Sequence, residues 1–452
     1  MTGRPAARQL VVLMGPKRLG VLEMGTHGRL RLDYDDEYLD DPSATPLSTS
    51  MPLSGRSYVG KVVVAFLQGL LPDDDDVLRR WAARFHVPPG NLFGLLSHVG
   101  EDCAGGAQFV RPERLGELRP GGVRWLADEV LRERVELLRT DPTSWLDETS
   151  EGRFSLAGAQ AKFALLHDEG RWGEPYGAVP TTHIIKPPSG RFADLDLNEH
   201  LCLSAARLAG LPAARSALVD FAGERAVAVE RYDRLRGADG WLRVHQEDLC
   251  QAFGLMPDRK YESEGGPGAA DICRLLRRLL PGADGDGAVA DFLRAVAFNW
   301  LIGGTDAHAK NYSLLLAGPQ VRLAPLYDLV SGFPYLAGPR GPRRSGQIRG
   351  NLKLAMKVGA NRELGLVRKE DWEELAAAAG TPKQSLLAEL ERLVGVVPPA
   401  FAAAASADDV VAAHSKLPQC LVQRVEANVM LCKNALAGRP GRQRPGASIG
   451  HR

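Results

Sequence analysis

The sequence predicts an α+β fold in two lobes, a strand-rich first lobe and a mostly helical second lobe, behind a small α+β N-terminal subdomain. Between residues 154 and 230, short strand-like runs alternate with loops, and one helical stretch interrupts them. From about residue 245, apolar residues recur mostly at helical spacing. Residues 9–66 alternate short apolar runs with turn residues, which is typical of a small mixed unit.

Changes in these patterns divide the 452 residues into five segments. Residues 1–110 are expected to form the N-terminal α+β subdomain, and residues 111–150 a linker with one helix. The β-rich part of the first lobe spans 151–235, and the helical second lobe spans 236–436. Residues 437–452 are rich in Gly, Arg and Pro and show no periodicity, so we expect a disordered tail there.

Periodicity and turn residues together place the individual elements. Strands are expected at 10–14, 28–34, 162–167, 182–186, 217–221, 225–230, 312–316 and 321–323. Helices are expected at 62–71, 77–85, 125–138, 197–208, 245–254, 269–280, 288–302, 371–379, 384–394 and 420–436. The four acids Asp73–Asp76 directly precede one of these helices, and we interpret them as partners of its macrodipole rather than as metal ligands.

Composition and charge exclude several classes of protein. The net charge is +1, from 56 basic and 55 acidic residues, so the whole molecule is not expected to attract nucleic acid, although a local basic patch stays open. No apolar run approaches the ~20 residues that span a membrane, and the run Leu10–Met14 is too short for a signal peptide. The six cysteines form no CxxC pair, which indicates reduced thiols in the cytoplasm.

The strongest chemical signal is the segment Leu301–Asn311, followed by Tyr327 and Asp328. Asp306 and Asn311 stand five residues apart at the end of an apolar helix, and Asp328 follows a predicted hairpin. Phosphoryl transfer needs a carboxylate that takes the proton of the attacking hydroxyl, and an amide and a second carboxylate that hold magnesium. Asp306 is therefore the predicted base, and Asn311 and Asp328 are the predicted metal ligands, although each residue alone more often caps a helix or a turn.

Two further residues lie inside this motif. His308 is expected to orient the loop by hydrogen bonding rather than to bind a metal. Lys310 has two interpretations that the sequence does not separate: it neutralises phosphate charge near the base, or it faces solvent.

A lysine at the end of a strand supplies the next feature. Lys186 ends an apolar run and is followed by two prolines. In kinases such a lysine binds the α- and β-phosphates and pairs with a helix glutamate, for which Glu199 is the candidate here. An isolated lysine of this kind would more often be an ordinary surface residue, so the interpretation depends on its context.

Two loops complete the pattern. The small residues Ala157–Ala159 lie one strand ahead of Lys186 and would let backbone amides approach a phosphate closely. The apolar strand at 225–230 ends in the polar residues Glu230–Tyr232. A hinge between two lobes would lie here and present its backbone groups to adenine. Taken alone, the second segment is more typical of a charged strand end.

Together these segments resemble the HipA family of bacterial serine/threonine-protein kinase toxins. SLAGAQAK is similar to the family's phosphate loop, HIIKPP to its lysine strand, and WLIGGTDAHAKNYSL and PLYDLVS to its catalytic and metal-binding motifs. The stretch LSTSMPLSGRSYVGKVVVAFLQGLLPD resembles the small domain that precedes the kinase core in longer members. The resemblance covers nearly the whole chain and implies a bilobal protein-kinase-like fold.

The resemblance also implies ATP and Mg²⁺ as cofactors and a set of nucleotide-binding residues. It implies that Ser155 is autophosphorylated, which silences the kinase, because a phosphoserine adds nearly two negative charges beside a site built for phosphates. The implied ATP-binding residues are Ala157, Gly158, Ala159, Gln160, Ala161, Lys162, Lys186, Glu230, Arg231, Tyr232, His308, Ala309, Lys310, Asn311, Tyr327 and Asp328.

The partners implied by the resemblance are a small DNA-binding HipB-like antitoxin, operator DNA reached mainly through that antitoxin, and a protein substrate. Well-studied members phosphorylate glutamyl-tRNA synthetase, which arrests growth and favours persistence. Basic residues after the metal aspartate could meet DNA phosphates, although such a run is more typical of a solvated face. They are Arg343, Arg344, Arg349, Lys353, Lys357, Arg362, Arg368 and Lys369.

The sequence departs from the family pattern in three places. AQAK lacks the Glu that is common before the Lys, KPP replaces the commoner KLP, and residues 361–369 lack a dense lysine cluster. Three hypotheses therefore compete: an active toxin kinase, a binding protein that keeps the fold and acts as a DNA-bound co-repressor, and a kinase for a small molecule or lipid. The first is favoured, because every polar group that the reaction needs is present.

Overall fold

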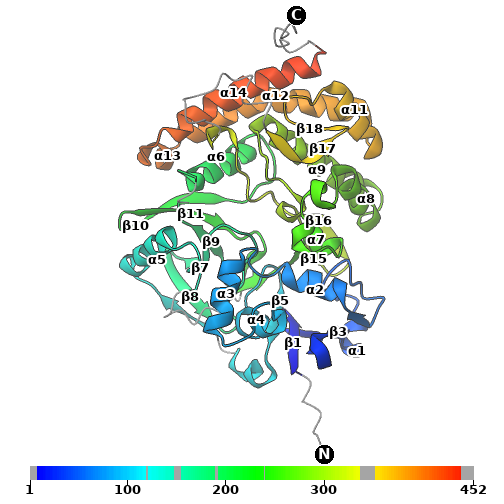
Figure 1. Ribbon diagram of the computed structural model, residues 1–452, viewed down its shortest axis with the longest axis vertical. Coiled ribbons are helices and arrows are strands. Elements are labelled where there is room, and N and C mark those ends of the chain that lie inside the picture. The colour runs from blue at the N-terminus through cyan, green and yellow to red at the C-terminus, as the bar shows by residue number, and fades with distance from the viewer. Residues whose placement is uncertain are drawn as a thin grey trace, which may run out of the picture. The chain divides into compact units, whose positions relative to one another are not determined.

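The computed structural model describes residues 8–118, 121–146, 154–188, 192–238, 240–335 and 352–438 (Figure 1). Within them the chain forms two compact units, and the predicted α+β class is confirmed. The first unit contains Met1–Leu203, Pro212–Gly266 and His308–Asp328, and holds most of the strands. The second contains Ser204–Leu211, Pro267–Ala307 and Leu329–Arg452, and is mostly helical.

The N-terminal part of the first unit is an antiparallel sheet with the strand order β4-β3-β2-β1-β5. Leu30, Leu32 and Tyr34 alternate with more exposed residues along β3 and point into the core, as the period of a half-buried strand requires. The strands are β1 (Arg8–Met14), β2 (Lys17–Met24), β3 (Leu30–Tyr34), β4 (Ser57–Val59) and β5 (Ala107–Val110), and the helices are α1 (Asp36–Leu39), α2 (Lys61–Gln68), α3 (Asp75–Arg84) and α4 (Leu92–Val99).

A six-stranded antiparallel sheet follows, with the order β10-β11-β9-β7-β8-β6. Helix α5 packs on β10 and β11. The elements are β6 (Gly122–Trp125), α5 (Asp128–Thr140), β7 (Phe163–Asp168), β8 (Arg171–Tyr176), β9 (His183–Lys186), α6 (Leu195–Leu208), β10 (Ser216–Phe221) and β11 (Glu224–Glu230).

A third sheet, ordered β14-β15-β16, carries the segment between Asn311 and Asp328. The expected hairpin there is confirmed as β15 (Ser313–Ala317) and β16 (Gln320–Leu323). The helix expected at 245–254 is wrong in its first half. Residues His245–Asp248 form strand β14, because they pair with β15, and α7 (Leu249–Ala252) begins only after Asp248 caps it.

In the second unit, helix α9 (Ala283–Ile302) packs against α8, α12 and α14 and is buried on nearly all sides in its second half. It ends at Gly303, which adopts a left-handed conformation with φ 67° and leads into the predicted catalytic motif. The other elements are α8 (Ala269–Leu279), β17 (Lys353–Val358), β18 (Asn361–Glu363), α11 (Lys369–Ala378), α12 (Lys383–Ala405), α13 (Asp408–Ala412) and α14 (Leu417–Leu436).

Smaller elements join these parts. The hairpin β12 (Arg234–Gly237) and β13 (Gly240–Arg243) follows β11. Short 3₁₀ helices lie at η1 (Thr26–Gly28), η2 (Pro112–Glu117), η3 (Pro257–Arg259), η4 (Glu262–Glu264), η5 (Ala309–Asn311) and η6 (Phe333–Tyr335). The predicted basic residues Arg343, Arg344 and Arg349, and the expected tail beyond 438, lie outside the described residues.

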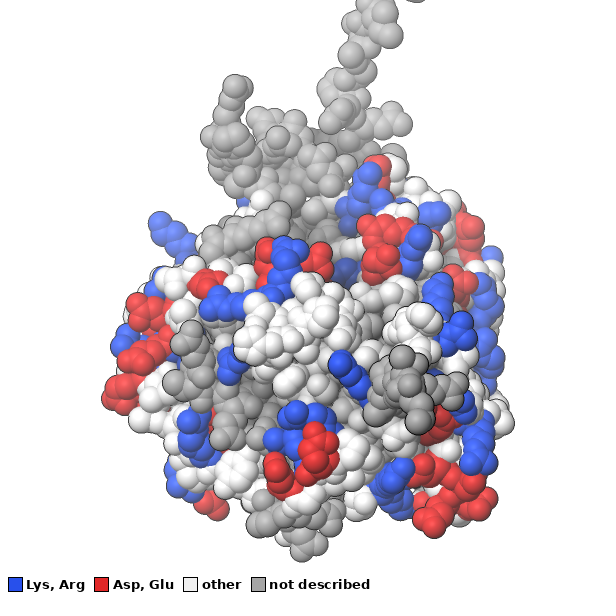
Figure 2. Space-filling model, turned by 60° about the horizontal axis from the view of Figure 1, so that its bottom comes forward, with Lys and Arg blue, Asp and Glu red and all other residues white. Residues whose placement is uncertain are grey.

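The surface and the thiols agree with the bulk properties. On the face drawn in Figure 2, basic and acidic side chains are interspersed among the described residues, as a net charge near zero would suggest. All six cysteines are free. Among the helices that the structure describes, none combines the length and the hydropathy needed to cross a membrane.

Candidate active site

Lys186 is the centre of the candidate site. It is the last residue of β9, and Pro187 and Pro188, which cannot donate to a sheet, end the strand there. Its Nζ lies 2.6 Å from Oε1 of Glu199 and 2.6 Å from Oδ1 of Asp328. The structure therefore brings together three of the predicted residues, from a strand, a helix and the segment after a hairpin.

Glu199 is fully buried in α6. Arg225 on β11 fixes the start of this helix through ion pairs of 2.6 Å to Asp194 and 2.7 Å to Asp196. The second carboxylate oxygen of Glu199, Oε2, is buried and has no hydrogen-bond partner among the described residues. The helix thus holds one carboxylate oxygen on Lys186 and leaves the other unsatisfied.

The charges of this triad depend on one another. Burial alone would lower the pKa of Lys186, but the carboxylates of Asp328 and Glu199 more than offset it, so the pKa lies above the ordinary value. Burial likewise opposes ionisation of Asp328, and the charge of Lys186 overrides it, holding the pKa of Asp328 well below its usual range. For Glu199, the effect of burial outweighs the attraction of Lys186, so the pKa is raised. Lys186 and Asp328 are therefore a charged pair at neutral pH.

Asp328 occupies a strained position. Its φ is 55°, in the left-handed region that Asp tolerates better than most residues but still at a cost. Backbone bonds from Leu326 to Pro212 and from Ala214 to Leu326, each 2.8 Å, hold the segment just before it. Such over-determined strain is typical of functional positions.

The loop His308–Asn311 lies close to Asp328 through Tyr327. The Tyr327 hydroxyl donates to the backbone carbonyl of Lys310 at 2.7 Å and lies 2.6 Å from the hydroxyl of Ser313. The His308 carbonyl accepts from the Asn311 amide at 2.9 Å, and the His308 ring packs edge-on against Tyr261. His308 thus orders the loop by its backbone and its ring.

Lys310 is buried, with 4% of its side chain exposed, and it pairs with the carboxylate of Asp73. Of the two interpretations that the sequence left open, the solvent-facing one is therefore wrong. Asp306 has an exposed side chain and belongs to the second unit, two residues before the chain enters the first unit at His308.

The candidate phosphate loop is tightly wound around Lys162. The Lys162 Nζ donates to the Ala157 carbonyl at 2.7 Å and lies 5.3 Å from the ring centre of Trp145. Gly158 has φ 102°, a backbone conformation that side chains rarely adopt, so the conformation of this turn favours glycine. Burial is the largest and the charge of Lys186 the second largest of the causes that lower the pKa of Lys162 to about 8.

Ser155 precedes this loop and is fully buried. Its hydroxyl donates to the Leu70 carbonyl at 2.6 Å, and its amide donates to the Asp102 carbonyl at 3.0 Å. In this conformation the hydroxyl is held by the N-terminal part of the unit.

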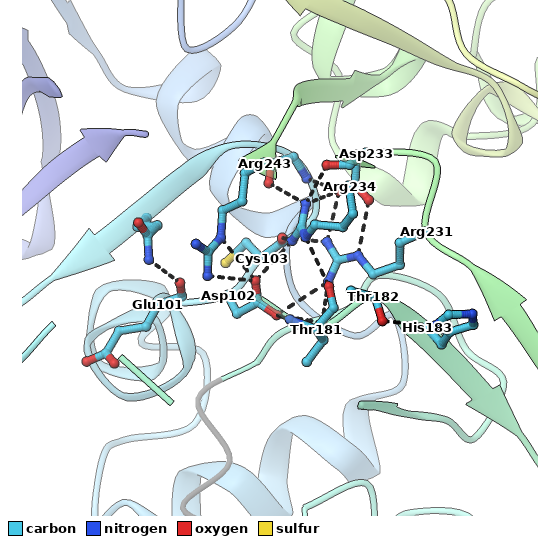
Figure 3. Close-up of polar contacts among 12 residues, drawn as sticks. Glu101, Asp102, Cys103, Thr181, Thr182, His183, Arg231, Asp233, Arg234 and Arg243 are labelled. Carbon is cyan, nitrogen blue, oxygen red and sulfur yellow. Dashed lines mark hydrogen bonds and ion pairs between the residues drawn. The ribbon is translucent and has the colours of Figure 1, made fainter. Parts of the chain in front are cut away.

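The predicted hinge segment Glu230–Tyr232 is anchored by a buried ionic network, which we call the Asp102 cluster (Figure 3). The Arg231 guanidinium donates to the hydroxyl of Thr181 at 2.8 Å and to the carboxylate of Asp233 at 2.9 Å. Its side chain is therefore engaged in structure rather than turned to a ligand. The cluster consists of Asp102, Asp233, Arg231, Arg234, Arg243 and Thr181.

The other two hinge residues differ. The Tyr232 ring packs 5.5 Å from that of Tyr327, and its hydroxyl donates to Gln246. Glu230 keeps its side chain partly exposed, while its amide donates to the Arg215 carbonyl at 2.8 Å. Tyr232 thus links the predicted adenine segment to the residue beside Asp328.

Sequence reasoning missed three residues that the structure places around the site: Asp73, Asp102 and Lys260. Asp73 was grouped with the acids that cap α3, and nothing in its spacing sets it apart except its position one residue before the capping Asp74. Asp102 and Lys260 lie in segments without a recognisable pattern, so only the fold reveals their contacts with charged partners.

In protein kinases a strand lysine pairs with a helix glutamate, and an aspartate after a hairpin holds the metal beside the nucleotide. The three residues that meet here are of these three kinds. Comparisons with known proteins agree with this class. The family described as HipA-like C-terminal domain matches residues 154–401, and the HipA N-terminal domain family matches residues 10–110. The chain belongs to the HipA family.

Relatives and solved structures extend this match along the chain. Y4mE of Sinorhizobium fredii, a kinase by its provisional name, is 36% identical over 82% of this chain and 86% of its own length. The serine/threonine-protein kinase toxin HipA of Shewanella oneidensis is 30% identical over 80% of this chain and 81% of its own. A solved Shewanella oneidensis complex of HipA, HipB and operator DNA contains a chain that matches with a TM-score of 0.77 and 25% identity, covering 95% of this chain and 98% of that one.

Proposed function

We propose that this chain is an Mg-ATP-dependent serine/threonine-protein kinase and the toxin of a toxin–antitoxin pair. The observation that carries the proposal is the buried contact of Lys186 with both Glu199 and Asp328 at 2.6 Å. Protein kinases use a strand lysine paired with a helix glutamate to hold the phosphates, and an aspartate after a hairpin to hold magnesium, so the groups that meet at Lys186 are those that nucleotide binding needs.

The residues fit both cofactors. Hard oxygen donors from Asp328 and Asn311 suit magnesium, which takes few protein ligands and keeps water and phosphate oxygens. Bound magnesium would neutralise charge on the phosphates. The Lys162 and Lys186 ammonium groups, with the backbone amides of the loop at Gly158, offer positive charge to a triphosphate.

Each group then has a task in the transfer. Lys186 orients the α- and β-phosphates, and Glu199 fixes its ammonium. Asp306 accepts the proton of the attacking serine or threonine hydroxyl, whose oxygen bonds to the γ-phosphorus as the bond to ADP breaks. The segment Glu230–Tyr232 borders the adenine.

Substrate and partner proposals follow from the family. We assign a protein substrate, a translation factor such as glutamyl-tRNA synthetase, and Ser155 as the autophosphorylation site. Because the Ser155 hydroxyl is bonded to Leu70 inside the unit, its loop must leave this conformation before it can accept phosphate. A HipB-like antitoxin and operator DNA reached through it are further parts of the proposal, and the Shewanella complex supports these two. A cytoplasmic location and growth arrest leading to persistence are proposed from the family resemblance alone.

The direct test is transfer of labelled γ-phosphate to the protein in the presence of magnesium. Asp306→Ala should lower transfer by about 100-fold or more, because a positioned base contributes at least that much. Asp284→Ala is the matched control, an exposed acid in the first turn of α9 in the same unit. Equal transfer by wild type and Asp306→Ala would exclude the proposed base.

A second function is favoured by the presence of operator DNA in the Shewanella complex. In it, the chain acts as a co-repressor with its antitoxin and its catalysis is dispensable. Two observations together would establish this function instead. The complex would still repress the operator when the chain carries both Asp306→Ala and Asp328→Ala, and the wild-type chain would transfer no phosphate.

A further inference from the structure

Asp73 stands apart from the three acids that follow it. Asp74 caps helix α3 through its side chain, which accepts from the amides of Asp76 and Val77, and Asp75 and Asp76 lie in the first turn. Asp73 precedes the cap, and its side chain is only 12% exposed. Its carboxylate is therefore not used by the helix that its neighbours stabilise.

The Asp73 carboxylate instead holds two ammonium groups. One oxygen, Oδ1, accepts from the Nζ of Lys310, and the other, Oδ2, lies 3.1 Å from the Nζ of Lys260. Lys260 also binds the loop through its backbone, because its carbonyl accepts from the Ala309 amide at 3.1 Å. Two independent contacts thus tie the loop that carries Lys310 to this acid and its partner.

The backbone of Asp73 reaches the phosphate loop as well. Its amide donates to the Gly158 carbonyl at 3.0 Å, and Pro72 and Gly158 form an isolated parallel bridge. Gly158 is the residue whose left-handed turn accommodates Lys162. One residue of the N-terminal subdomain therefore touches both segments proposed to surround the triphosphate.

Electrostatics show that this contact is part of the same charged site. Burial would raise the pKa of Asp73, but the charges of Lys310 and Lys260 lower it below its ordinary value. The negative charges of Asp328, Asp73 and Glu199 also act on Lys162, where each of them raises the pKa. Asp73 is thus ionised at neutral pH and within electrostatic range of the Lys162 ammonium.

We propose that Asp73 is a positioning residue for phosphoryl transfer: it fixes the Lys310 ammonium beside the catalytic loop and, through its amide, holds the turn of the phosphate loop at Gly158. This inference rests on the proposed kinase function. It assigns to the N-terminal subdomain a part of the active site that the kinase core does not supply. Asp73 acts through Lys310 and does not itself contact the reacting atoms.

The test compares Asp73→Asn, which keeps the shape of the side chain and removes its charge, with Asp76→Asn, an exposed acid three residues along. Asp73→Asn should lower kcat by about tenfold to a hundredfold, since small misplacements of a catalytic group cost that much, while KM for ATP changes less than about threefold. Asp76→Asn should match wild type. An unchanged kcat in Asp73→Asn, or an increase, would overturn the proposal.

A double-mutant cycle separates positioning from a merely structural role. If Asp73 acts through Lys310, then adding Asp73→Asn to Lys310→Met should lower kcat by less than about twofold beyond Lys310→Met alone. Multiplicative losses in the double variant would show that Asp73 serves folding or another group, and would refute the assignment.

A readout without catalysis keeps this test distinct from the kinase proposal. Acylation of Lys310 by an amine-reactive reagent, measured by mass spectrometry, should rise by about tenfold in Asp73→Asn, because the buried side chain loses the ion-pair partner that holds it and becomes more accessible to the reagent. Lys17, paired with Asp41 at the surface, serves as the internal reference. Unchanged labelling of Lys310 in Asp73→Asn would contradict the contact between Asp73 and Lys310. Raised labelling, combined with no phosphate transfer by the wild-type protein, would support the contact but contradict the kinase function.

Discussion

At the residue scale, Lys162 shows how the surroundings set a charge. Its buried ammonium donates a hydrogen bond to one backbone carbonyl. The charge of Lys186 repels this ammonium, and three carboxylates attract it. The balance lowers its pKa to about 8, close to neutrality. A lysine with this pKa is mostly protonated at neutral pH, where it can attract a triphosphate, and it loses its charge in mildly alkaline solution.

This balance predicts a pH dependence of nucleotide affinity. Below about pH 8 Lys162 is protonated and attracts phosphates, and above it the free protein loses that charge. The Kd for Mg-ATP should therefore rise by up to about tenfold per pH unit between pH 8 and 9.5. In Lys162→Arg, whose charge persists, calorimetry should show a much flatter profile, and an equally steep one would contradict the assignment.

The same scale shows what a sequence can reveal. Lys186, Glu199 and Asp328 were identifiable because each stands at a recognisable place: a strand end before prolines, an early helix position, and the end of a hairpin. Asp73 was not, because its partners, Lys260 and Lys310, are far along the chain and no local pattern records them. Long-range ion pairs leave no periodic trace in a sequence.

At the element scale, apolar periodicity located about half of the strands of the first unit and missed others, among them β2, β5, β6 and β8. The error at 245–254 has a physical cause. HQED has no strong strand pattern, and β14 forms because its backbone pairs with β15 and because Ser48 and Thr49 bond the Glu247 carboxylate. Tertiary pairing thus outweighed local propensity.

The Asp102 cluster joins the strand ends of the first unit, and it makes a stability prediction. Burial opposes ionisation of Asp102, but three arginines hold its pKa well below its usual range. Asp102→Ala leaves Arg231, Arg234 and Arg243 short of an anion and should lower the free energy of unfolding by about 3–5 kcal/mol at pH 7. Asp168→Ala, which breaks a more exposed pair with Arg236, should cost less than about 1 kcal/mol.

The pH dependence of that difference has a definite sign. Because the folded-state pKa of Asp102 lies below its unfolded value, its contribution is complete above the unfolded pKa and is lost as pH falls below about 4. Urea unfolding of wild type and Asp102→Ala should therefore converge in acid. A gap that stays constant down to the lowest pH at which the protein folds would show that the lost charge is not the cause.

At the scale of the whole molecule, the proposed site draws on residues that are distant in sequence. Lys186, Glu199, Asn311 and Asp328 belong to the first unit, and Asp306 to the second, two residues from the junction at His308. The N-terminal subdomain contributes Asp73 and, through Leu70, the restraint on Ser155. The domain limits expected from composition, including 1–110 and 236–436, remain predictions, since the compact units interleave segments of the chain.

The central claim is that Lys186, Asn311, Asp328 and Asp306 gather around one nucleotide. A crystal structure of the full chain with Mg²⁺ and a non-hydrolysable ATP analogue tests it most directly. We predict a metal ion bound by oxygens of Asn311, Asp328 and the phosphates, Lys186 on the α- and β-phosphates, and Asp306 facing the γ-phosphate. A nucleotide bound elsewhere, or Asp306 turned away from the γ-phosphate with Lys186 still held by Glu199, would contradict the claim.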